Sequence, residues 1–193
     1  LRASAFGDIH IMYPMIASVE EVKQANAMLD ECKEELTAEG KEFNKDIKVG
    51  IMIEVPAAAV ISPILAKYVD FFSIGTNDLT QYTMAVDRGN SKVAYLYSVY
   101  NPAVIRSIKR IISAAANENI IAGMCGEAAA DPLLTPLLIS FGLKEFSVNA
   151  SSILRTRAQI AKWTKAEADK VADEVMKCAT QEEVYEILKR YER

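Results

Sequence analysis

The feature that most limits the fold is an alternation of short, mostly apolar runs with longer helical patterns. Runs of strand type occupy residues 9–14, 49–55, 69–74, 120–124 and 145–148. Between the first two, apolar residues recur at helical spacing, at Val22, Ala25, Leu29, Cys32 and Leu36. Apolar strands that alternate with helices are typical of a parallel sheet covered by helices. The sequence therefore predicts an α/β fold with right-handed crossovers.

The starts of several helices are marked by capping residues. Ser18 and Glu21 form a capping box before the first helical pattern, and Thr180 and Glu183 form another before the last. Other helical patterns occupy residues 57–67, 102–117, 153–163 and 166–178, and Asp131-Pro132 indicates one more helix start. No stretch is rich enough in Pro, Gly or Ser to mark a linker, so we expect one domain over residues 1–193.

Composition argues against several functional classes. The chain has 193 residues, 51% of them hydrophobic, which is enough to bury a core. No apolar run approaches the roughly 20 residues needed to cross a bilayer, so we expect no membrane span and a cytoplasmic location. The formal net charge of -4 provides no basic field, so nucleic-acid binding is not expected. An anionic substrate would have to be held by local arginines or by a metal.

Polar residues follow the apolar runs at their carboxyl ends. Glu54 ends one run, Gly-Thr-Asn-Asp at 75–78 ends the next, and Cys-Gly-Glu at 125–127 ends a third. Ligands bind at the carboxyl ends of parallel strands, both in open sheets and in (β/α)8 barrels. These residues are therefore expected to meet in space.

The two carboxylates at these ends suit a divalent cation. Glu54 and Asp78 come from neighbouring strands, and oxygen ligands with room for water and a phosphate are what Mg2+ or Mn2+ prefers. Each residue alone also has a structural interpretation. Asp78 could cap a helix from Leu79, and Glu54 could be an ordinary rim carboxylate. Together they favour a metal site.

Two residues near Asp78 could hold an anion. Asn77 lies where a helix N-terminus offers amide donors to a phosphate. Arg88 follows in the next loop, and its guanidinium has the fork geometry that binds phosphate oxygens in pairs. A solvated surface arginine is the alternative for Arg88.

The three cysteines and the single histidine have different predicted roles. They include no CxxC pair, and their odd number indicates neither a disulfide framework nor a structural zinc site. The thiol of Cys125 could exchange a proton with a substrate, although an inert buried thiol is the alternative. Cys32 and Cys178 lie on helical stripes and are predicted to be core. His10 lies inside a strand, so a packed or hydrogen-bonded side chain is expected rather than a phosphate carrier.

Four ordered segments resemble enzyme I of the bacterial phosphoenolpyruvate:sugar phosphotransferase system. They are IEVPAA at 53–58, FFSIGTNDLTQY at 71–82, VDRGN at 86–90 and GMCGE at 123–127. The resemblance runs nearly end to end. Pyruvate phosphate dikinase and phosphoenolpyruvate synthase share elements similar to the second and fourth segments, so a domain of either remains an alternative. A non-catalytic module for dimerisation or ligand sensing is a further one.

The resemblance implies a (β/α)8 barrel that binds phosphoenolpyruvate and Mg2+. Carried over by motif, Glu54 and Asp78 would ligate Mg2+, while Asn77, Asp78 and Arg88 would bind the substrate. Cys125 would protonate the enolate carbon to give pyruvate. The phosphoryl group would pass to a histidine on a separate N-terminal domain and then to the histidine-bearing phosphocarrier protein, as the first step of sugar uptake. Dimerisation through this domain is also implied.

The chain departs from that family in what it lacks. Such a barrel typically has about 250 residues and eight strands, whereas five strand-type runs are present here. We therefore expect a partial barrel with extra C-terminal helices, without the first βα units and the phosphohistidine domain, and inactive alone. Unpaired sheet edges should favour self-association. Two points stay open: whether Glu127 orients Cys125, and what LYSVY at 96–100 contacts where the family more often has LYQP.

Overall fold

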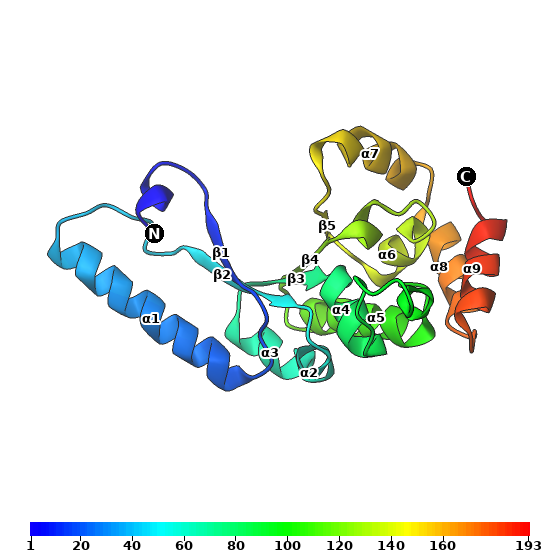
Figure 1. Cartoon of the computed structure of the whole chain (residues 1–193). Helices are drawn as coiled ribbons and strands as arrows, with labels where there is room; N and C mark the ends of the chain where they lie inside the picture. Colours follow the sequence, from blue (N-terminus) through cyan, green and yellow to red (C-terminus); the bar gives the residue numbers. More distant parts are fainter.

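The computed structural model describes all 193 residues and contains one five-stranded sheet. The strands are β1 (His10–Tyr13), β2 (Lys48–Ile53), β3 (Phe71–Gly75), β4 (Ile121–Cys125) and β5 (Glu145–Phe146). They lie side by side in chain order, and every neighbouring pair is parallel. The sheet is not closed, because β1 pairs only with β2 and β5 only with β4 (Figure 1). The predicted α/β class and the partial barrel are confirmed.

Helices follow the strands, and a group of helices ends the chain. They are α1 (Val19–Ala38), α2 (Pro56–Val60), α3 (Ser62–Leu65), α4 (Thr76–Met84), α5 (Pro102–Asn117), α6 (Thr135–Phe141), α7 (Ile153–Ala161), α8 (Lys165–Val175) and α9 (Gln181–Arg190). Short 3-10 turns are η1 (Arg2–Ala5), η2 (Ala66–Tyr68), η3 (Ala94–Leu96), η4 (Glu127–Ala130) and η5 (Ala150–Ser152). No helix is long and apolar enough to cross a membrane.

Local sequence explains where several of these helices begin and break. Both predicted capping boxes form, at α1 and at α9. The helix expected over residues 57–67 is instead divided into α2, α3 and η2. Pro63 lies in the first turn of α3, and a proline has no N–H with which to continue the preceding helix. Asp78 does not cap α4, because the helix begins at Thr76 and its cap position is Gly75.

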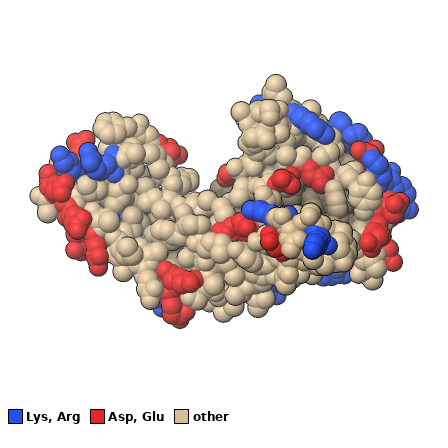
Figure 2. Space-filling model, in the orientation of Figure 1, with Lys and Arg blue, Asp and Glu red and all other residues tan.

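The two faces of the sheet have different environments. Alternate strand residues such as Ile51, Phe72 and Met124 are fully buried under the helices, in one cluster of 33 core residues. On the other face Met12 is 39% exposed and Ile121 is 53% exposed. This face borders a cavity of about 750 Å3. Figure 2 shows the surface hollowed on this side, between the N-terminal end of the molecule and α7.

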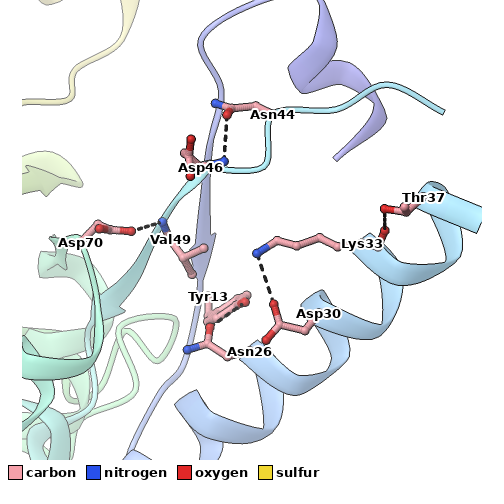
Figure 3. A network of polar contacts seen from close by, with 9 residues as sticks. All are labelled: Tyr13, Asn26, Asp30, Lys33, Thr37, Asn44, Asp46, Val49 and Asp70. Carbon is pink, nitrogen blue, oxygen red and sulfur yellow. Dashed lines mark hydrogen bonds and ion pairs between the residues drawn. The ribbon is translucent and has the colours of Figure 1, made fainter. Parts of the chain in front are cut away.

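The helix α1 makes few contacts with the sheet, so one sequence prediction is wrong. Cys32 was expected in the core, but it is exposed, and Val22 is the only buried residue of the helix. The reason is that α1 covers an edge strand and has no neighbouring element on its outer side (Figure 1). Figure 3 shows its main polar link to the sheet, in which the Tyr13 hydroxyl donates to Asn26 Oδ1 at 3.2 Å. Cys178 is buried, as predicted.

Candidate active site

The predicted site residues come together at the carboxyl ends of β2, β3 and β4. Gly75 and Cys125 are paired in the sheet register, and Glu54 directly follows the last residue of β2. A Cβ atom at position 75 would lie 2.8 Å from Glu54 Oε2, so the carboxylate occupies the space that a side chain there would need. Asp78 lies in the first turn of α4, which starts directly after β3. The glycine thus lets Glu54 approach the β3 end closely.

The carboxylates of Glu54 and Asp78 form a pair at this end of the sheet. Glu54 is 4% exposed, and its Oε1 accepts a hydrogen bond from the Met15 amide at 2.8 Å. Burial raises the pKa of Glu54; the Met15 amide lowers it, and the charge and hydrogen bond of Asp78 raise it further. Met15 has a left-handed backbone, with φ 55, which no sequence pattern predicted. The Asp78 side chain is 33% exposed, so a buried carboxylate stands beside a partly exposed one. A cation would stabilise such an acidic pair.

These two carboxylates are better suited to a cation whose other ligands are water and substrate than to one that is bound entirely by protein side chains. No group of three or more His, Cys, Asp or Glu side chains is arranged to hold a metal. Mg2+ is commonly bound through one or two carboxylates, with waters and substrate phosphates completing its six oxygens. Glu54 and Asp78 meet that requirement, since both belong to the same strand-end cluster and the charge of Asp78 acts on Glu54.

The thiol of Cys125 is half-buried beside this pair. Its Sγ donates to the Ile74 carbonyl at 3.6 Å, and the Ser73 hydroxyl donates to Sγ at 3.9 Å. Burial raises the pKa of Cys125; Ser73 lowers it, and the negative charges of Glu54 and Asp78 raise it. The thiol therefore keeps its proton at neutral pH, as a proton donor requires.

The loop after β4 is locked to the loop after β3. The Thr76 hydroxyl donates to the Cys125 carbonyl at 2.9 Å, and the Glu127 amide donates to Asn77 Oδ1 at 3.3 Å. Gly126 has φ 89, and a Cβ atom there would lie 2.4 Å from Thr76 Oγ1. Asn77 is thus held against the β4 loop, and Glu127 contributes its backbone amide to this contact.

Arg88 lies at the edge of the site. Its Nη2 is 3.6 Å from Asp78 Oδ1, and its side chain is 44% exposed. Its backbone amide donates to Gln81 Oε1 at 3.2 Å, which fixes the loop to α4. Tyr97, from the segment whose contacts the sequence left open, donates its hydroxyl to the Asn77 carbonyl at 3.2 Å. Sequence reasoning did not assign Tyr97 to the site, and its nearness to Arg88 in the chain was the only signal.

The single histidine lies at the opposite end of the sheet. His10 is the first residue of β1, 3.5 Å from Asp8, and its ring centroid is 5.6 Å from that of Phe71. Its side chain is 49% exposed, so it is less packed than the sequence suggested. It lies at the start of β1, whereas Glu54 and Cys125 lie at the carboxyl ends of β2 and β4.

Comparison with known proteins places the chain in a family. The model of the PEP-binding domain of PEP-utilising enzymes, where PEP is phosphoenolpyruvate, matches residues 1–165. A phosphoenolpyruvate-protein phosphotransferase of Staphylococcus aureus is 49% identical over 191 residues, which cover 99% of this chain and 33% of the relative. One of Geobacillus stearothermophilus is 53% identical over 190 residues, with 98% and 33% covered.

The chain thus spans about a third of the length of these curated relatives. A solved structure, a citrate lyase from Burkholderia xenovorans LB400, matches with a TM-score of 0.61 at 16% identity, over 98% of this chain and 65% of that one. At that identity the match supports the fold alone. With the family model covering most of its length, the chain belongs to the PEP-utilising enzymes and corresponds to their PEP-binding domain.

Proposed function

We propose that this chain is the substrate-binding part of a phosphoenolpyruvate-protein phosphotransferase. The names of relatives about half identical to it support this activity. The observation that carries the proposal is the meeting of Glu54, Asp78 and Cys125 at three adjacent strand ends. In the reaction, the phosphoryl group leaves phosphoenolpyruvate for an enzyme histidine and then passes to a histidine-bearing phosphocarrier protein, leaving pyruvate as the product.

Each site residue has a role in this proposal. Glu54 and Asp78 would hold Mg2+, which when bound neutralises negative charge on the phosphoryl group and on the enolate. Arg88 and Asn77 bind the phosphate, and Asp78 also borders the substrate. When the bond between phosphorus and the enol oxygen breaks, Cys125 gives its thiol proton to the methylene carbon of the enolate. Pyruvate and a thiolate result, and the reverse reaction begins with removal of that proton.

The phosphoryl acceptor must come from outside residues 1–193. The only histidine, His10, begins β1, whereas Cys125 ends β4, so the two lie at opposite ends of the parallel strands. The relatives are about three times as long as this chain, which leaves room for a domain that carries the acceptor. We therefore propose that residues 1–193 alone bind the substrate without completing the transfer. We also propose that the protein is located in the cytoplasm and acts as a homodimer.

Calorimetric titration of the full-length protein with phosphoenolpyruvate, with and without Mg2+, tests the proposal. The wild type should bind phosphoenolpyruvate more tightly when Mg2+ is present, and Asp78→Ala should lose that dependence. Asp173→Ala, at an exposed position of α8, is a matched control and should bind like the wild type. Absence of binding in the wild type, or unchanged Mg2+ dependence in Asp78→Ala, would overturn it.

A further inference from the structure

We propose that Thr76 is a positioning residue that sets the place of the Cys125 thiol through a hydrogen bond to its backbone. The inference rests on the proposed function, because the place of this thiol matters only if it gives its proton to an enolate. Thr76 is the first residue of α4 and is 2% exposed. Its hydroxyl donates to the Cys125 carbonyl at 2.9 Å. The bond therefore joins the start of α4 to the last residue of β4.

The sheet holds Cys125 on one side only. Cys125 pairs with Gly75 of β3, whereas the pairing between β4 and β5 ends one residue earlier, at Met124. The next residue, Gly126, has φ 89, and a glycine restrains the path of the chain less than any other residue. Cys125 thus lies where the regular sheet ends, and the hydrogen bond from Thr76 extends its attachment beyond Gly75.

The contacts of the thiol itself are weaker than this backbone contact. The Cys125 Sγ donates to the Ile74 carbonyl at 3.6 Å and accepts from the Ser73 hydroxyl at 3.9 Å. Sulfur is a weak donor and a weak acceptor. The bond from the Thr76 hydroxyl, in contrast, joins two oxygens at an ordinary hydrogen-bond distance. Of these three contacts, the one from Thr76 is therefore expected to hold Cys125 most firmly.

The close approach of Gly126 to Thr76 is a second, independent observation. A Cβ atom at position 126 would lie 2.4 Å from Thr76 Oγ1. A side chain there would occupy the space of the hydroxyl, so only a glycine lets the backbone pass this close to it. The chain that follows Cys125 is therefore built around the Thr76 hydroxyl.

The positioning role and a purely structural role predict different kinetics. If the hydroxyl only stabilised the fold, its loss would lower the melting temperature and leave kcat unchanged. If it sets the place of the thiol, its loss slows proton transfer while phosphoenolpyruvate still binds through Asn77, Arg88 and the cation. A change that lowers kcat and leaves the affinity unchanged is the mark of an interaction that acts in the transition state.

The experiment uses the full-length protein and compares two variants. Thr76→Val keeps the shape of the side chain and removes the hydroxyl, whereas Thr76→Ser keeps the hydroxyl. With Mg2+, phosphoenolpyruvate and the phosphocarrier protein, kcat should fall about tenfold in Thr76→Val, the scale of one hydrogen bond. In Thr76→Ser, kcat should stay within about twofold of the wild-type value. Calorimetry with Mg2+ and phosphoenolpyruvate should give the same Kd for all three proteins.

The solvent isotope effect supplies a readout that a structural role would not change. Because proton transfer from Cys125 is slower in Thr76→Val, the ratio of kcat in H2O to kcat in D2O should rise above that of the wild type. Thr83→Val is the matched control, since Thr83 lies on the same helix and its buried hydroxyl has no hydrogen-bond partner. This control should keep the wild-type kcat and isotope effect.

Three results would overturn the inference. They are an unchanged kcat in Thr76→Val, an equal loss of affinity and kcat in that variant, and a kcat in Thr76→Ser as low as in Thr76→Val. If Thr76→Val does not fold, Thr76→Ala removes the same hydroxyl and is judged by the same results. Absence of phosphoenolpyruvate binding in the wild type, or full turnover in Cys125→Ala, would instead overturn the proposed function, so the two failures are distinguishable.

Discussion

Replacement of Gly126 by alanine should damage the site through two separate effects. The first is conformational, because Gly126 has φ 89 and ψ -177, a region that only glycine enters readily. Forcing a side chain into it costs roughly 1–3 kcal/mol. The second is steric, because the new Cβ would lie 2.4 Å from Thr76 Oγ1 and 2.9 Å from Asn77 Oδ1. Overpacking of this kind typically costs about 1–3 kcal/mol.

The sum predicts a loss of roughly 2–6 kcal/mol in the free energy of unfolding of Gly126→Ala. Gly142→Ala is the matched control. Gly142 has φ 92, but nothing lies within 4 Å of its would-be Cβ, so only the conformational cost of about 1–2 kcal/mol applies. Urea unfolding followed by circular dichroism measures both variants. The difference between them comes mainly from the contact with Thr76 and Asn77 and from the less favourable backbone region of Gly126.

Binding gives a second readout for the same pair of variants. If the β4 loop and Asn77 are locked as described, Gly126→Ala should lose most of its affinity for phosphoenolpyruvate, while Gly142→Ala keeps it. The reasoning about the locked loops would be refuted if Gly126→Ala were as stable as Gly142→Ala. It would also be refuted if Gly126→Ala bound phosphoenolpyruvate with wild-type affinity.

Three further predictions follow from the site and the sheet. The raised pKa of Glu54 means that its stabilising contribution is complete below the unfolded pKa and is lost as pH rises through the folded one. Glu54→Gln should therefore make the metal-free protein more resistant to urea at pH 7, yet less responsive to Mg2+; an unchanged urea midpoint would count against this. Cys125→Ala should bind phosphoenolpyruvate normally and form no pyruvate, and equal losses of both would contradict the proton-donor role. Residues 1–193 alone should associate through the free edges of β1 and β5, whereas a monomer at all concentrations in sedimentation would argue otherwise.

The sequence predicted the central strands well because β2, β3 and β4 each have one buried face. Residues 49–55 and 120–124 were expected as strands, and Lys48–Ile53 and Ile121–Cys125 form them. The last strand is shorter than expected, because β5 lies at an edge and only Glu145–Phe146 pairs in register. Strand ends of a parallel sheet must lie along one edge, and for that reason the grouping of Glu54 with Asp78 and Cys125 was predictable as well.

The contributions that the sequence did not predict depend on the path of loops. Met15 has a left-handed backbone conformation and donates its backbone amide to Glu54. Every residue except proline has such an amide, so the sequence does not show which one will be used. Tyr97 follows a 3-10 turn and contacts Asn77 from there, and no periodic sequence pattern predicts that turn. The error at Cys32 has another origin. Helical spacing shows which residues share a face, but it does not tell whether another element covers that face.

Because α1 packs sparsely, its backbone amides should be less protected from hydrogen exchange than those of the central strands. Of its 20 residues, only Val22 belongs to the buried cluster, whereas α5 contributes many more. The helix α1 is held mainly by its own capping box and backbone hydrogen bonds. Its amide protons can therefore exchange with solvent while the hydrogen bonds between β2, β3 and β4 stay intact. The first βα unit is thus the low-stability end of the molecule, and the strands that carry the carboxylates and the thiol are its most durable part.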